Sequence, residues 1–356
     1  MFDKYEDLNI QAREYFILYL DENVREKKVY ERCKKEIELL YEKGILFIVE
    51  YLHKFSKESE YNQMCFKGMT NNLLLLYILG LSKVDPRKYN LPYELFTARK
   101  FNIEFLHFNS MDFIEFVEKN SYELRIFKCN YEESSDKDLN KFNEDRYLFL
   151  PTDWRLPENM TFKLNEFNQF EIVEDCSRFN DDYIILKMTD KGLILEIEVD
   201  LHYALETDFE KELERIIKPV SFDDYVKIIS FAHSTHAWKL NQEELYKANK
   251  IDKKNLISNR EDIYEYLLNH SIDNETALDI IKILTNGTIK SESKLWKKYI
   301  KIMKENKCDD MFIDILSKII FISGRGQAVA ECLYALDENN YYTEETCLQT
   351  CLKFHN

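Results

Sequence analysis

The chain has 356 residues, of which 45% are hydrophobic and 14% aromatic, and its formal net charge is −16. This length allows about two domains of ~100–200 residues each, and the apolar content excludes an intrinsically disordered chain. A strongly acidic protein repels polyanions unless its basic residues are segregated, so charge alone does not favour a nucleic-acid partner. Seven glycines and five prolines are few for this length. Long helices with short polar connections are therefore expected.

The cysteines and the N-terminus indicate the compartment. Eight cysteines include no C-x-x-C pair, and the N-terminus lacks the basic-then-apolar pattern of a signal peptide. Cys347 and Cys351 share a helix face at i,i+4, but a metal would need two further ligands, so we interpret them as small residues of a terminal helix. No apolar run reaches the ~20 residues of a membrane span. We expect a soluble cytoplasmic protein with free thiols and no membrane partner.

The N-terminal region, residues 6–96, has the pattern of helices. Apolar positions such as Val29, Cys33, Ile37 and Leu40 recur with a period near 3.6 residues. Gly44 marks a break between two helices. An almost wholly apolar helix is predicted over residues 69–81, deeply buried.

Residues 101–200 change character, because aromatic and β-branched residues alternate with polar ones. Strands are expected at 103–105, 123–127, 147–150, 170–173, 183–186 and 193–197. The helical period returns near residue 208 and persists to the C-terminus. The predicted fold class is α+β: a helical N-terminal segment, a β-rich centre and a helical C-terminal half. We place the domain boundary so that the domains are 1–217 and 218–356.

Three sequence blocks in the C-terminal half follow one another in a fixed order and spacing. They are Lys218-Pro219-Val220-Ser221-Phe222, His233-Ser234-Thr235-His236-Ala237-Trp238 and Ile257-Ser258-Asn259-Arg260-Glu261-Asp262-Ile263. Together they resemble the fingers region of PolC-type bacterial DNA polymerase III α subunits, whose pattern is approximately R-P-K-T-F, S-H-G-T-D-V-W and I-G-C-R-D-D-I. The resemblance implies a palm-like domain over 1–217 and a fingers-like domain over 218–356.

The same resemblance assigns the metal-binding palm positions. Where the family carries three aspartates, this chain has Asn102, Glu104 and Thr189. Two divalent cations about 3.5–4 Å apart cannot be held without matching anionic oxygens. The adjacent Asp190 would face the other side of a strand, and Glu104 is most simply a solvent-facing strand carboxylate. We therefore expect no catalytic residue, no metal and no cofactor.

The resemblance also locates two sites that contact nucleotide phosphates in the family. The first is a glycine- and serine-rich loop, matched here by Lys67-Gly68-Met69-Thr70-Asn71-Asn72-Leu73. The second is a helix start, F-P-K-A-H-A, matched by Ser323-Gly324-Arg325-Gly326-Gln327-Ala328. Lys67 and Gly68 in the first, and Arg325 and Gln327 in the second, are the degenerate nucleotide-binding candidates.

Two weaker candidates remain. His233 and His236, three residues apart, could bind a metal, but scaffold hydrogen bonding is the preferred interpretation. A basic stripe at helical spacing lies opposite Leu295, Tyr299, Ile302 and Met303 and is the best nucleic-acid surface available, although a solvated helix face is the commoner meaning of such a run. The stripe consists of Lys294, Lys297, Lys298, Lys301 and Lys304.

The leading hypothesis is a catalytically inactive PolC-like pseudo-polymerase. It would bind a replication protein or, weakly, a nucleic acid, or interfere with replication of an invading element. The alternative is a minimal DNA-directed DNA polymerase or nucleotidyltransferase with a rearranged, Mg²⁺-dependent metal site. A structural oligomerisation subunit is a third option, and the fold alone cannot choose among them.

Overall fold

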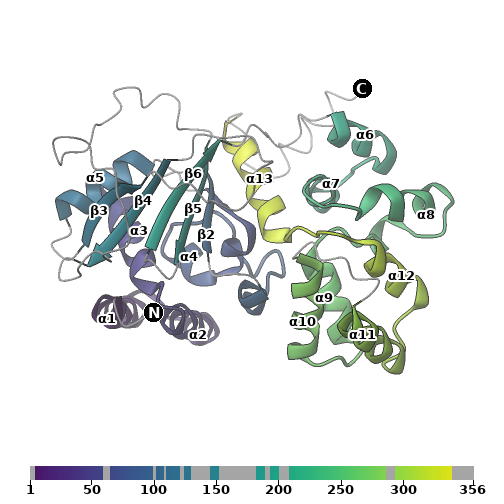
Figure 1. Cartoon of the computed structure of the whole chain (residues 1–356), viewed down its shortest axis with the longest axis horizontal. Coiled ribbons are helices and arrows are strands. Elements are labelled where there is room, and N and C mark those ends of the chain that lie inside the picture. Colours follow the sequence, from purple (N-terminus) through teal and green to yellow (C-terminus); the bar gives the residue numbers. More distant parts are fainter. Residues whose placement is uncertain are drawn as a thin grey trace. The chain divides into compact units, whose positions relative to one another are not determined.

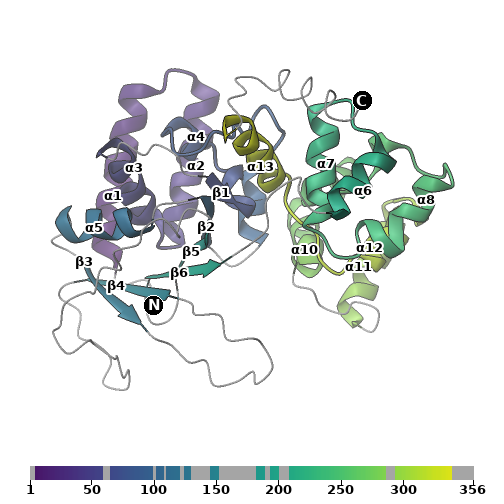
Figure 2. The ribbon, with the colours of Figure 1, turned by 90° about the horizontal axis from the view of Figure 1, so that it is seen from above.

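The computed structural model describes residues 5–58, 65–98, 102–107, 110–120, 124–129, 145–151, 182–188, 193–199, 208–285 and 293–338 (Figures 1 and 2). The chain divides into two compact units. Unit 1 comprises residues 1–83 and 101–201, and unit 2 comprises residues 84–100 and 202–356. The domain boundary predicted between residues 217 and 218 stays a prediction. No helix in these ranges is long and apolar enough to span a bilayer.

Unit 1 begins with three helices: α1 (Glu6–Asn23), α2 (Lys27–Glu42) and α3 (Leu46–Glu58). Gly44, at φ 68°, separates α2 from α3 as predicted. The predicted helix over 69–81 is broken into a 3₁₀ helix, Gly68–Asn72, and the short α4 (Leu74–Ile78). The break falls at Leu73, whose backbone is extended. The segment is buried as expected, from Gly68 to Leu76.

The six strands of unit 1 form one antiparallel sheet in the order β1-β2-β5-β6-β4-β3. The strands are β1 (Cys65–Lys67), β2 (Asn102–His107), β3 (Leu124–Cys129), β4 (Asp145–Pro151), β5 (Asp182–Met188) and β6 (Leu193–Val199). Helices α1, α3 and α5 (Ser110–Asn120) gather on one face of this sheet (Figures 1 and 2).

The predicted β-rich, palm-like centre is wrong. Helix dominates the part of the chain that the structure describes, and α5 interrupts the predicted strand region. The sheet also takes β1 from the segment predicted to be helical, so strands and N-terminal helices form one unit. The signal for α5 was present, because Phe113, Phe116 and Val117 are spaced i,i+3,i+4 and buried. The strand predicted at 170–173 lies outside the described residues.

Unit 2 is helical, as the pattern from residue 208 predicts. Its helices are α6 (Asp208–Ile217), α7 (Phe222–Ala232), α8 (Glu243–Lys247), α9 (Arg260–Asn269), α10 (Asn274–Thr285), α11 (Lys294–Glu305), α12 (Asp310–Lys318) and α13 (Arg325–Glu338).

The three resemblance blocks contain residues that cap helices and pack the core of unit 2. The Ser221 hydroxyl caps α7 by accepting from the Asp224 backbone N–H. Asn259 and Asp262 form a reciprocal capping box at the start of α9. Trp238 is 1% exposed and packs on Phe231 and Tyr246. These residues fix where helices begin and how they pack.

Arg260 serves the scaffold of unit 2. Its side chain is buried and its Nε donates to the Ile322 carbonyl oxygen at 2.8 Å. Its backbone N–H donates to the Ser323 carbonyl oxygen at 3.0 Å. Arg260 thereby ties the start of α9 to the segment that leads into α13.

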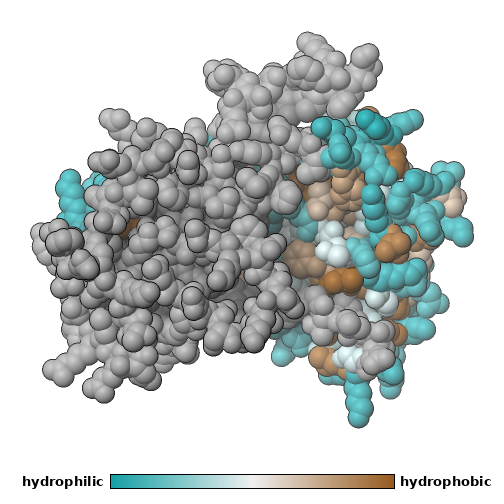
Figure 3. All heavy atoms as spheres, turned by 45° about the horizontal axis from the view of Figure 1, so that its top comes forward, coloured by the Kyte–Doolittle hydropathy of each residue, from teal (hydrophilic) through white to brown (hydrophobic). Residues whose placement is uncertain are grey.

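Leu240 combines an unusual backbone with an exposed side chain. Its φ is 63° and its side chain is 72% exposed. Figure 3 shows that hydrophobic groups lie among hydrophilic ones on the surface of unit 2. The buried amides of Asn241 and Gln242 hold the loop by donating to the carbonyl oxygens of His236 and Ala237.

Replacing Leu240 with glycine should raise the free energy of unfolding by up to about 1 kcal/mol. A left-handed backbone conformation costs an L-residue roughly 1–2 kcal/mol, which glycine avoids. Part of this stabilisation is lost because an unfolded chain with glycine has greater conformational entropy. Leu240→Ala is the matched control, because it removes the same apolar surface but keeps a Cβ. Denaturant unfolding in which alanine and glycine are equally stabilising would refute backbone strain as the cause.

His53, on α3, is a buried histidine that should make unit 1 sensitive to acid. Its Nδ1 lies 3.0 Å from the Tyr15 hydroxyl. Burial, helped by the charge of Lys57, lowers the pKa of His53 from 6.5 to about 4. Below pH 6.5 the histidine is protonated in the unfolded chain, whereas in the folded protein it is protonated only below about pH 4. The free energy of unfolding therefore falls as the pH is lowered between these values, by at most about 3 kcal/mol.

This acid sensitivity is measured by denaturant unfolding of the parent and of His53→Gln between pH 7 and pH 4. The parent should lose more stability than the variant, because other titrating groups contribute equally to both. Parallel curves would show that folding does not lower the pKa of His53.

Candidate functional site

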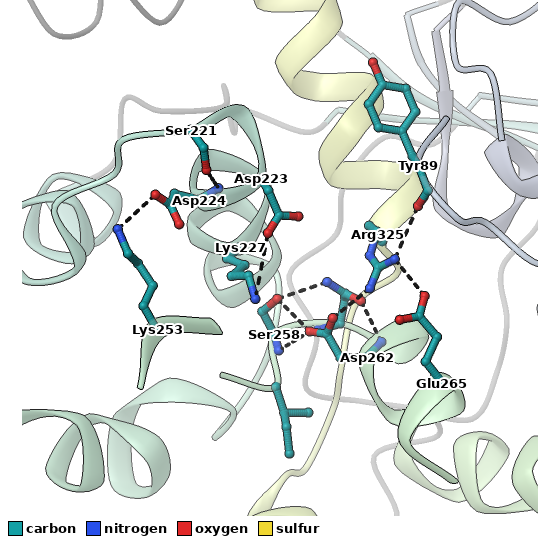
Figure 4. Close-up of polar contacts among 12 residues, drawn as sticks. Tyr89, Ser221, Asp223, Asp224, Lys227, Lys253, Ser258, Asp262, Glu265 and Arg325 are labelled. Atoms are coloured by element: carbon teal, nitrogen blue, oxygen red, sulfur yellow. Dashed lines mark hydrogen bonds and ion pairs between the residues drawn. The ribbon is translucent and has the colours of Figure 1, made fainter. Parts of the chain in front are cut away.

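A buried ionic cluster surrounds Arg325, the first residue of α13 (Figure 4). Its Nη2 donates to Asp262 Oδ1 at 2.8 Å, and its Nη1 donates to Glu265 Oε1 at 3.0 Å and to the Tyr89 carbonyl oxygen at 3.3 Å. Both acidic residues belong to α9. We call Arg325, Glu261, Asp262, Glu265 and the Tyr89 carbonyl the Arg325 cluster.

The electrostatics of this cluster hold the guanidinium in place. The Arg325 side chain is only 12% exposed. Burial by itself would lower the pKa of Arg325, but the carboxylates of Asp262, Glu261 and Glu265 outweigh it and raise that pKa. Asp262 is fixed in turn, because its Oδ2 accepts from the backbone N–H groups of Ser258 and Asn259. The Arg325 guanidinium is thus paired with a carboxylate, that of Asp262, whose position is fixed by backbone hydrogen bonds.

Glu261 closes the N-terminus of α13. Its Oε2 accepts the backbone N–H of Arg325 at 2.6 Å, and the residue is fully buried. The first N–H groups of a helix lack intrahelical partners and favour an anion. Here a carboxylate of the protein itself occupies that position.

The same arrangement occurs in unit 1, at the start of α4. Glu36, fully buried on α2, accepts the backbone N–H of Leu75 through Oε2 at 2.8 Å. Its Oε1 pairs with Arg32 Nε at 2.9 Å, while Arg32 Nη2 donates to the Asn72 carbonyl oxygen at 2.9 Å. Desolvation is the main cause that raises the pKa of Glu36, and its pairing with Arg32 opposes this.

The loop before α4 is closed by its own hydrogen bonds. Residues 68–72 are all buried. The Asn71 amide donates to the Phe66 carbonyl oxygen at 2.6 Å and accepts from the Ser82 hydroxyl at 3.2 Å. Gly68 has φ 64°, a conformation that favours glycine. Lys67 lies in β1, and the nucleotide-binding roles predicted for Lys67 and Gly68 stay predictions.

Gln327 and His233 meet at one carboxylate. Gln327 Nε2 donates to Glu331 Oε1 at 2.9 Å, and His233 Nε2 lies 2.7 Å from Glu331 Oε2. His236 is exposed. His233 therefore has the scaffold contact that we preferred for it, while Gln327 as a nucleotide ligand stays a prediction, as does Arg325.

Two of the three palm positions lie on one strand. Asn102 and Glu104 lie on β2, opposite Lys187 and Ile185 of β5, and Glu104 is also opposite Lys67 of β1. Thr189 lies outside the described residues, as do Cys347 and Cys351. Among the residues the structure describes, no group of three or more His, Cys, Asp or Glu side chains is placed to hold a metal ion.

All five lysines of the predicted basic stripe are exposed on α11. The helix buries Trp296, Tyr299 and Met303 on its other side. Leu295, expected on that buried side, is instead 46% exposed. The nucleic-acid role of these lysines stays a prediction.

Sequence reasoning missed the residues that close these sites, namely Glu36, Glu261 and Glu331. Glu36 had a usable signal, because it lies beside Ile37 and between Cys33 and Leu40, where an acidic residue stands on the edge of a core stripe. Glu331 lies four residues after Gln327 and so shares its helix face. Glu261 had no such signal, since its partner is the backbone of a residue 64 positions away.

Comparisons with known proteins agree with the resemblance over part of the chain. No protein-family model matches. The chain is similar to the DNA polymerase III PolC-type of Staphylococcus aureus strains MW2, USA300 and Newman. Each match is 29% identical over 130 residues, which cover 36% of this chain but only 9% of the relative's length. The chain is thus a distant relative of PolC-type DNA polymerase III.

Proposed function

We propose that this chain is a non-catalytic relative of PolC-type DNA polymerase III that acts by binding a protein partner, such as a component of the replication machinery. One observation carries the proposal. At both helix starts where the resemblance implies phosphate contacts, α4 and α13, a buried carboxylate of the protein accepts a backbone N–H. A phosphate group there would meet a negative charge in a desolvated environment, which is strongly unfavourable.

The arrangement of unit 2 supports a binding role. Trp238, Arg260 and the Asn259 capping box are all engaged in packing or in capping helices. Two cations beside these helix starts, Arg32 and Arg325, are paired with carboxylates. A scaffold with these contacts can present a surface without performing chemistry.

The purified chain should give no template-dependent primer extension with Mg²⁺ or Mn²⁺. The reason is that the palm position of Asn102 lacks a carboxylate and the phosphate positions are occupied by Glu36 and Glu261. The assay uses a primed template, all four deoxynucleotides and a PolC-type polymerase as positive control. Extension that disappears in Glu104→Ala would overturn the proposal and establish the alternative, a minimal polymerase with a rearranged Mg²⁺ site.

A further inference from the structure

The lysine face of α11 has a fixed orientation. Trp296, Tyr299 and Met303 are buried beneath it. The Tyr299 hydroxyl donates to Asp279 Oδ2 at 3.2 Å, and Trp296 Nε1 donates to Ser317 Oγ at 3.4 Å. The helix therefore cannot turn its lysines away. From Lys294 to Lys304 the face extends about 15 Å, roughly three turns.

The charges on this face are poorly compensated. Lys301 lies 3.6 Å from Glu305 and Lys304 lies 3.7 Å from Asp310, with every one of these side chains at least 60% exposed. Exposed pairs of this kind contribute little to stability, because water and salt screen them. Within residues 293–338 and the other described ranges, no salt bridge involves Lys294, Lys297 or Lys298.

Two of the five lysines are placed unfavourably for the helix itself. Lys294 opens α11, Lys297 follows within its first turn, and that turn contains no acidic residue. Cations at a helix N-terminus oppose the helix dipole, whereas Lys304, in the last turn, is favoured by it. In a chain with 65 acidic and 49 basic residues, a run of five exposed lysines that begins at an unfavourable helix start points to a surface that meets an anionic partner.

Apolar residues flank the lysines on one side. Leu295 is 46% exposed and Ile302, seven residues on, is half-buried. Positions seven apart share a helix face. An aliphatic contact bordered by charge is typical of protein interfaces, whereas contacts to a nucleic-acid backbone need only cations and other donors. The net charge of −16 also opposes a dense polyanion more than a short acidic segment.

We propose that the α11 face, Lys294, Lys297, Lys298, Lys301 and Lys304 with Leu295 and Ile302, docks an acidic amphipathic helix of a partner protein. The proposal rests on the proposed binding function and names the chemistry of the partner. The acidic side of that helix lies along the lysines, and its apolar edge lies on Leu295 and Ile302.

The test uses the full chain and a synthetic acidic amphipathic peptide of about 15 residues, long enough to span the face. Its glutamates stand at i, i+3, i+4 and i+7, with leucines on the adjoining stripe. A scrambled peptide of equal composition is the control ligand. Binding is measured by fluorescence anisotropy at several salt concentrations. The parent should bind the amphipathic peptide at least about tenfold more tightly than the scrambled one.

Two variants locate the binding. The triple variant Lys297→Glu, Lys298→Glu, Lys301→Glu should weaken peptide binding at least about tenfold. Its matched control reverses three exposed lysines of α2, Lys28, Lys34 and Lys35, and should bind like the parent. Leu295→Ser should weaken binding while leaving its salt dependence unchanged. Circular dichroism verifies that each variant is folded.

The proposal is overturned if the peptide binds the α11 and α2 triple variants equally, if it binds no better than its scrambled form, or if a DNA oligonucleotide binds the α11 face more tightly than the peptide. None of these outcomes bears on primer extension. Failure of the α11 proposal is therefore distinguishable from failure of the proposed non-catalytic function, which primer extension tests.

Discussion

Replacing Arg325 with alanine should lower the free energy of unfolding by about 3–5 kcal/mol, because removing one partner of a buried ion pair leaves uncompensated charge. Asp262, Glu265 and the buried Glu261 would then lie together without their central cation. Denaturant unfolding followed by circular dichroism measures the change.

Two controls separate burial from charge. Arg325→Lys keeps the charge but lacks the forked donors that reach two carboxylates, so it should be intermediate. Lys239→Ala removes an exposed pair with Glu212 and should cost less than about 1 kcal/mol. If Arg325→Ala is as stable as the parent, the carboxylates do not hold Arg325, and its guanidinium is available to a phosphate ligand.

Replacing Trp238 with alanine should cost about 3–5 kcal/mol, the usual range for a large core aromatic residue. Its indole is 1% exposed and lies between Phe231, at a ring separation of 5.1 Å, and Tyr246, at 5.7 Å. Alanine would leave a cavity between Phe231 of α7 and Tyr246 of α8. Thermal and denaturant unfolding measure the loss.

Trp238→Phe is the matched control, and it should recover most of this stability because it keeps an aromatic ring in the cavity. Arg260→Ala should also be harmful, since the Ile322 carbonyl oxygen loses its donor. Trp238→Ala and Arg260→Ala proteins as stable as the parent, yet unable to bind a partner, would show that these two residues form a surface site.

Local signals made much of unit 2 predictable. Ser221 and Asn259 each precede a helix with an acidic residue three positions later, so their capping roles could be inferred from the sequence. Trp238, a large aromatic residue within the second resemblance block, is 1% exposed. These features depend on residues close together in the chain.

The rest depended on contacts between distant segments. The frequent aromatic residues in 101–200 made strand and helix patterns hard to separate, and α5 was missed although Phe113 and Phe116 pack on Phe55 of α3. The roles of Glu36 and Glu261 are set by partners 39 and 64 residues away. The sequence could indicate that Glu36 lies at the edge of a core stripe, but the helix starts that Glu36 and Glu261 contact could be identified only from the structure.

The most direct test of the non-catalytic reading is a titration of the full chain with a deoxynucleoside triphosphate and Mg²⁺, followed by isothermal calorimetry. With Glu36 and Glu261 at the starts of α4 and α13, and Arg325 held by Asp262 and Glu265, no saturable binding is predicted up to millimolar nucleotide. Saturable micromolar binding that Arg325→Lys weakens, in a variant shown to be folded, would contradict this account.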